Sequence, residues 1–198
     1  MMRPANRGLR GPALQIALVL GGLALLASVF LPYWQLKITA PQYPRGLRVQ
    51  IYLSHVEGDI QEIDTLNHYI GMRPLKDAGR LERAVSLAGV VAMLFALLAA
   101  VFYQRKLSIF FLLPVAVFPF VFMGDLYFWM RDFGLNLNPH APLSSSVKPF
   151  VPPLFGAGKI AQFKAVAWFG AGFYLSLFAA LVSAAAVALR LSGDRERR

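Results

Sequence analysis

Four long apolar runs constrain this chain more than any other feature of its sequence. A helix needs about 20 residues to cross the hydrocarbon core of a bilayer, and the runs cover residues 13–34, 84–103, 107–130 and 165–189. Hydrophobic residues make up 57% of the 198 residues and charged residues only 15%, a balance that a soluble domain rarely shows. The sequence therefore predicts an all-α membrane protein built on a four-helix transmembrane bundle.

The ends of these runs carry aromatic residues, as membrane-interface belts do. The first run follows the arginines of segment 1–12, and a signal peptide is one interpretation of it. Against that, the run is long for a signal peptide and ends in LPYW rather than in small residues. We expect an uncleaved membrane anchor.

The basic residues indicate how the spans are oriented. Segments 1–12, 104–106 and 190–198 hold nine Lys and Arg residues, although they are short, whereas the long loops 35–83 and 131–164 hold eleven. Because short loops rich in Lys and Arg stay in the cytoplasm, we expect a bacterial inner-membrane protein with both termini inside and both long loops outside. The net charge of +10 gathers mainly at span ends, so it does not indicate nucleic-acid binding.

The first outer loop, 35–83, is predicted to fold into a small α+β subdomain. LRVQIYL at 47–53 alternates apolar and polar residues, as a half-buried strand does, and LKIT at 36–39 can pair with it across the PQYPRG turn. The following GDIQEIDTLNHYIGM predicts a short helix that Asp59 caps and Gly71 ends. The expected buried stripe of this helix is Ile63, Leu66 and Ile70.

A candidate metal site lies on the opposite face of this short helix. Asp64 and His68 fall away from the apolar stripe, and Met72 continues their face if the helix persists past its glycine. Imidazole with thioether suits copper, whereas imidazole with carboxylate suits Zn²⁺ or Cu²⁺. The other two histidines, His55 and His140, are also in outer loops and are possible additional ligands. The alternative interpretation is a helix face that contacts solvent or a partner.

Asp125, in FMGDLYFWM, is the only acidic residue inside a predicted span. An ionisable side chain within a membrane is a functional candidate, and Met123 and Met130 could add soft ligands for a metal. The position of Asp125 near the outer end of the span favours the alternative, an interfacial carboxylate with a local partner. Pro114 and Pro119 in the same span predict a kink.

The second outer loop, 131–164, holds five prolines and is predicted to be irregular, packed on the bundle mouth or on a partner. GAGK at 156–159 is not a phosphate loop, because the preceding glycine of that motif is missing and Ile160 replaces Ser or Thr. No nucleophile–base motif occurs in the sequence, so no enzyme is predicted. The chain has no cysteine, which excludes thiolate metal sites.

LNHYIGM in the first outer loop and VKPFVPPLFGAGKIAQF in the second, together with the four-span layout, resemble known membrane proteins. These are small multi-span proteins encoded near nitrous oxide reductase maturation and copper-handling genes. The resemblance implies an accessory role in copper delivery or in the assembly of a metalloenzyme outside the cytoplasm. It also implies that His68 and Met72 hold the copper.

Two functions are therefore open at the level of the sequence. The first is a membrane accessory protein whose outer loops bind copper or a metalloenzyme partner during assembly. The alternative is a non-catalytic structural or interaction subunit of a membrane complex, with no metal of its own. In both cases the expected contacts are the lipid bilayer and a protein on the outer side, and neither nucleic acid nor nucleotide.

Overall fold

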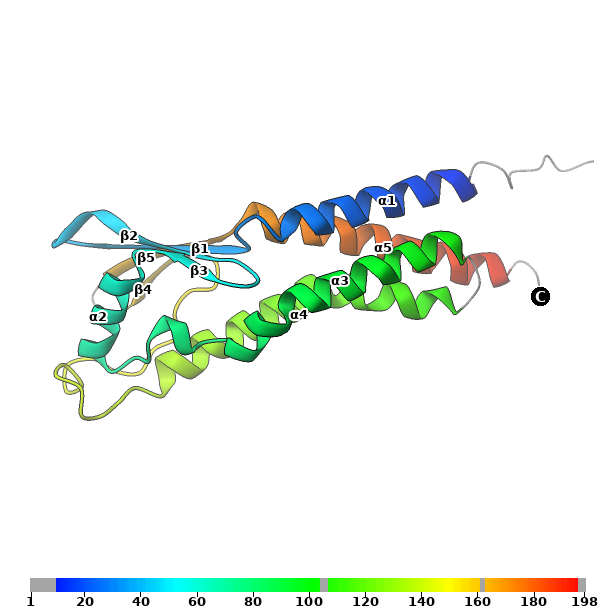
Figure 1. Cartoon of the computed structure of the whole chain (residues 1–198). Coiled ribbons are helices and arrows are strands. Elements are labelled where there is room, and N and C mark those ends of the chain that lie inside the picture. The colour runs from blue at the N-terminus through cyan, green and yellow to red at the C-terminus, as the bar shows by residue number, and fades with distance from the viewer. Residues whose placement is uncertain (1–9, 104–106, 161–162, 196–198) are drawn as a thin grey trace, which may run out of the picture.

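The computed structural model describes residues 10–103, 107–160 and 163–195. Four long helices form a bundle: α1 (Arg10–Ser28), α3 (Arg80–Phe102), α4 (Ser108–Leu135) and α5 (Ala171–Arg195). All four are long and apolar enough to cross a membrane, which agrees with the four predicted spans in number and order. A sheet domain lies at one end of the bundle. The start of α1 and the end of α5 lie at the opposite end (Figure 1).

The sheet has five antiparallel strands in the order β3-β2-β1-β5-β4. The strands are β1 (Trp34–Ala40), β2 (Tyr43–Ile51), β3 (Val56–Gly58), β4 (Gly156–Ile160) and β5 (Phe163–Phe169). The predicted hairpin in the first loop is confirmed, because Leu36 of β1 lies opposite Val49 of β2. The sheet is nevertheless larger than the predicted subdomain, since two of its strands come from much later in the chain.

The predictions for the second loop and for the start of the fourth span are wrong where strands β4 and β5 form. Residues 156–169 were expected to be irregular loop and then membrane helix, but they form a hairpin that adds to β1. The helix itself starts at Ala171, six residues after the predicted start at 165. The all-α description therefore applies to the bundle and not to the whole chain.

The other element bounds differ less from the expected ones. α1 ends at Ser28, and Trp34, the expected end of the first span, begins β1 instead. α4 continues five residues past the expected end at 130, and its last turns lie beside the sheet (Figure 1). The predicted turn at 104–106 lies outside the described residues.

Helix α2 (Ile60–Ile70) is the predicted short helix, and it lies against one face of the sheet (Figure 1). Gly71 ends it in the left-handed conformation, with φ of 85°, as predicted. Asp59 is not a side-chain cap, because its Oδ2 accepts a hydrogen bond from the Arg48 backbone amide at 2.8 Å instead. A single 3-10 turn, η1 (Leu75–Asp77), then leads to α3.

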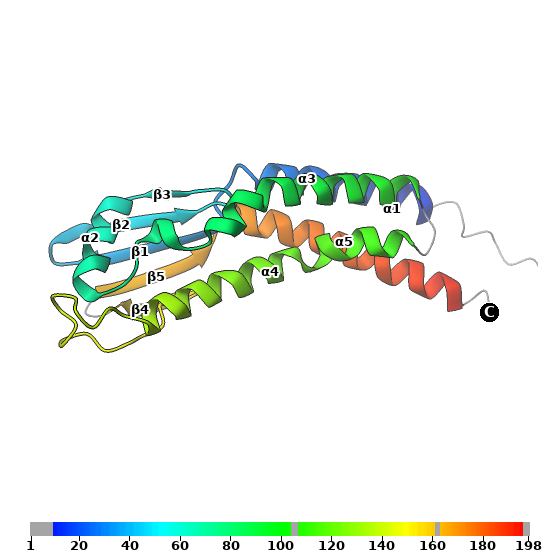
Figure 2. The ribbon, with the colours of Figure 1, turned by 60° about the horizontal axis from the view of Figure 1, so that its bottom comes forward.

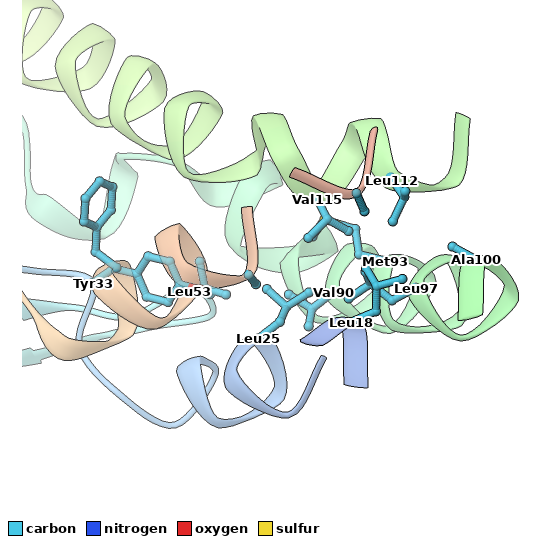
Figure 3. Packing of buried hydrophobic residues seen from close by; sticks show 13 residues of the cluster. Leu18, Leu25, Tyr33, Leu53, Val90, Met93, Leu97, Ala100, Leu112 and Val115 are labelled. Atoms are coloured by element: carbon cyan, nitrogen blue, oxygen red, sulfur yellow. The ribbon is translucent and has the colours of Figure 1, made fainter. Parts of the chain in front are cut away.

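Two apolar clusters hold the structure together. The first lies within the bundle, where side chains of α1, α3 and α4 point toward one another (Figure 3); it includes Leu18, Leu25, Val90, Leu97 and Leu112. The second lies between the sheet, α2 and the sheet-proximal half of α4; it includes Trp34, Leu36, Val49, Ile63 and Leu126. Because α4 contributes to both clusters, the sheet domain is packed directly on the bundle.

A close junction joins the sheet to the bundle where α1 ends and α5 begins. The Gly170 amide donates a hydrogen bond to the Tyr33 carbonyl at 2.9 Å, and the Gly172 amide donates one to the Pro32 carbonyl at 3.0 Å. The Tyr33 side chain is fully buried, and its hydroxyl lies 2.7 Å from Ser28 Oγ. Burial raises the pKa of Tyr33 to about 12, so this hydroxyl remains protonated and hydrogen-bonded at physiological pH.

Candidate basic docking face and the predicted metal residues

One face of the sheet is uncovered and basic. Figure 1 shows α2 and α4 on one side of the sheet and no described helix on the other side. Residues directly opposite in an antiparallel pair share a face, and two such pairs on the uncovered side are Lys37 with Arg48 and Lys159 with Lys164. We call these four cations, with Val166 between them, the basic sheet face.

No ion pair among the described residues involves the four cations of the basic sheet face. Two carboxylates lie at its β3 edge: Asp59 Oδ2 accepts a hydrogen bond from the Arg48 amide, and Glu57 lies opposite Gln50. Like charges directly opposite each other destabilise a sheet, yet both pairs on this face are cation opposite cation. The ion pairs among the described residues are those of Arg73 with Asp132 and Arg80 with Asp77, and His55 lies within ion-pair distance of Glu57. The face therefore carries charge that a partner of opposite sign would compensate.

The basic sheet face extends away from the bundle. β1 runs away from the bundle (Figure 1), and Thr39, which lies opposite Lys164, is five residues beyond Trp34. At about 3.4 Å per residue, five residues of strand span roughly 17 Å. Lys164, and Lys159 opposite it on β4, therefore lie at the end of the sheet domain that is far from the bundle.

The structure separates the predicted metal ligands His68 and Met72. His68 is exposed on α2 and shares a shallow hollow with Asp64, whereas Met72 lines an apolar cavity on the inner side of the domain. Gly71 turns the chain between them, so Met72 does not continue the face of His68. Asp64 Oδ1 accepts a hydrogen bond from the Leu75 amide at 2.7 Å, which ties α2 to the next segment.

The other two histidines lie apart from one another. His55 is in the β2–β3 turn, where its ring stacks on Tyr52 with centroids 4.4 Å apart and its Nε2 lies 3.2 Å from Glu57 Oε1. His140 is exposed in the loop after α4, and its amide donates to Asn138 Oδ1. Within the described ranges, no three His, Asp or Glu side chains come together as a metal-binding group.

Asp125 lines the apolar cavity that Met72 also reaches. This cavity has a volume of ≈ 370 Å³ and lies beneath the inner face of the sheet, between α3 and α4. Most of its walls are aliphatic or aromatic, and Glu82 and Arg83 join Asp125 among the few polar side chains. No local sequence pattern indicates this cavity, because its walls come from elements that are far apart in the chain.

These features define a four-span membrane protein with a sheet domain that is apolar and covered on one face, basic and open on the other. No protein-family model matches the chain, and no curated protein matches it. Its function is inferred from the geometry of its own residues.

Proposed function

We propose that this protein is a non-catalytic accessory protein of the bacterial inner membrane, and that its sheet domain docks an acidic protein outside the cytoplasm. The observation that carries the proposal is the basic sheet face, whose two cation pairs form no ion pair with a carboxylate in the described parts of the chain. Complementary charge steers association and fixes the register of two surfaces.

The dimensions of the basic sheet face favour a protein over a small anion. The cations occupy β2, β1, β5 and β4, which are neighbours in the sheet. With strands about 4.8 Å apart, the charges extend over roughly 14 Å. Val166, 46% exposed, lies among them and offers an apolar contact. Basic side chains around an exposed apolar residue can contact an acidic protein surface, as the polar rim of an interface does.

Reversal of charge on the face tests the docking proposal. A partner held by this face should be lost when Lys37 and Lys164 are replaced together by glutamate, and should remain bound when two cations elsewhere on the domain are replaced. Retention of the partner by the reversed face would contradict the proposal.

The outward orientation of the sheet domain has its own test, since the chain contains no cysteine. Gln42 is exposed in the β1–β2 turn, and Arg197 is in the tail that the charge distribution assigns to the cytoplasm. We expect a membrane-impermeant maleimide to label Gln42→Cys in intact spheroplasts and Arg197→Cys only after lysis. The reverse pattern would place the sheet domain in the cytoplasm.

Copper binding at His68 is the second candidate, and the exposure of His68 beside Asp64 is what favours it. Titration of the purified protein with Cu(I) is the measurement. Because Met72 lies in a different space, we expect His68→Ala to abolish stoichiometric binding and Met72→Ala to retain it. Equal binding by the parent and His68→Ala would exclude a metal role for this histidine.

A further inference from the structure

The cavity beneath the sheet continues into the membrane-spanning part of the bundle. Gly89 and Met93 of α3 and Phe118 of α4 line it together with inner-face residues of the sheet. With a rise of about 1.5 Å per residue, Met93 lies roughly 14 Å, and Arg83 roughly 28 Å, from the far end of α3 at Phe102. The hydrocarbon core is about 30 Å thick. The cavity therefore extends from the middle of the bilayer to its surface, and then into the sheet domain.

The cavity opens sideways toward lipid. α3 and α4 diverge as they approach the sheet (Figure 2). Val85 and Val121 both line the cavity, and yet they are 53% and 60% exposed. At this depth exposed side chains of a spanning helix contact lipid tails. A molecule dissolved in the bilayer can thus enter between the two helices without crossing water.

The inner part of the cavity presents a buried hydrogen-bond donor without an acceptor. Asn67 of α2 is only 6% exposed, lines the cavity, and its Nδ2 has no hydrogen-bond partner in the described structure. Trp129 Nε1, which is also buried, has the Asp125 carboxylate near it as an acceptor. A buried donor without an acceptor is unfavourable. A ligand that places a carbonyl oxygen beside Asn67 Nδ2 would accept its hydrogen bond and remove the free-energy cost of the unpaired donor.

The same walls restrict which ligand fits. A volume of ≈ 370 Å³ is in the range of small-molecule sites. The charged headgroup of a phospholipid would lose its hydration among Leu36, Ile38 and Ile63, so it does not fit the inner part. An uncharged, flat ring with a carbonyl acceptor and an apolar tail fits both the Asn67 donor and the lateral opening.

We propose that this cavity binds an isoprenoid quinone from the bilayer, with a ring carbonyl accepting a hydrogen bond from Asn67 and the tail leaving between α3 and α4. The proposal concerns binding alone. It uses the inner face of the sheet, so it stands or falls independently of docking on the basic sheet face.

Tryptophan fluorescence gives a direct test, because quinones quench indole emission on contact. Trp34 and Trp129 line the cavity. Trp168 of β5 pairs with Gln35 of β1 and does not line the cavity. In full-length Trp168→Phe protein in detergent, we expect decylubiquinone to quench emission saturably. Asn67→Leu, which removes the donor at similar volume, should weaken binding about tenfold. It should not lower the unfolding temperature, because it also removes an unpaired buried amide.

Two glycines supply a matched pair of blocking variants. A Cβ at Gly89 or at Gly124 would meet nothing within 4 Å, but only Gly89 lines the cavity. We expect Gly89→Phe to abolish saturable quenching and Gly124→Phe to retain it. Linear, unsaturated quenching that is equal in the parent and Gly89→Phe would overturn the proposal. So would displacement of decylubiquinone by an equimolar phospholipid, which would identify an acyl chain as the occupant.

Discussion

Replacing Gly170 by alanine is expected to destabilise the protein by about 3 kcal/mol or more, because the new methyl group has no space. A Cβ at this position would lie 2.1 Å from the carbonyl oxygen of Pro32, which is backbone and cannot move aside by a rotamer change. The Gly170 amide also donates to the Tyr33 carbonyl, so a shift of this segment breaks the link between β5 and the end of α1. The sheet domain would lose its fixed position on the bundle.

Thermal unfolding in detergent measures this effect. For a chain of this length, about 3 kcal/mol corresponds to a fall in Tm of roughly 6–12 °C. Gly124→Ala is the matched control, since a Cβ there meets nothing within 4 Å and alanine favours a helix. An unchanged Tm in Gly170→Ala would mean that the Pro32 carbonyl does not approach this glycine. The described contact between the end of α1 and the start of α5 would then be incorrect.

If the basic sheet face docks the proposed acidic protein, the double variant Lys37→Glu/Lys164→Glu is expected to bind that protein about 100-fold or more weakly. Its fold should become slightly more stable. Each new carboxylate would lie directly opposite a remaining cation, Arg48 or Lys159, on the neighbouring strand. Opposite charges in such positions stabilise a sheet by about 0.2–1 kcal/mol per pair. The formal charge of the four positions changes from +4 to zero, which removes the attraction for an acidic partner.

The amount of partner isolated with tagged full-length protein from native membranes measures the loss. The control is Lys76→Glu/Lys148→Glu, which changes the net charge equally at two exposed positions outside the basic sheet face. Equal loss in both double variants would mean that overall charge, and not this face, holds the partner. Reduced thermal stability of Lys37→Glu/Lys164→Glu would contradict the assigned strand register.

The spans and the first hairpin could be predicted because their signals are local. Each helix is a single apolar run, and residues 47–53 alternate beside a turn rich in proline and glycine. β5 has no such signal. Its outward residues include the apolar Val166 and Trp168, so FKAVAWF merges with the apolar helix that follows. Its pairing with β1 joins segments more than 120 residues apart, and no local pattern shows this.

The same limits apply to the candidate site residues. The exposure of His68 follows from helical periodicity and was predicted, but the place of Met72 depends on the reversal at Gly71. Lys37 and Arg48 could have been paired across the predicted hairpin. Lys159 and Lys164 could not, because the strands that carry them were not expected. The cavity is formed by α3, α4 and the sheet together, so only the tertiary structure reveals it.

The most direct measurement of the proposed docking function is photo-crosslinking from the centre of the basic sheet face. A photoreactive amino acid replaces Val166 in the full-length protein in native membranes, and in a control it replaces Gln61, which is exposed on α2. We predict one discrete adduct with an acidic protein from position 166, none from position 61, and loss of the adduct in the Lys37→Glu/Lys164→Glu background. No adduct from position 166, the same adducts from both positions, or an adduct that survives charge reversal would contradict the account.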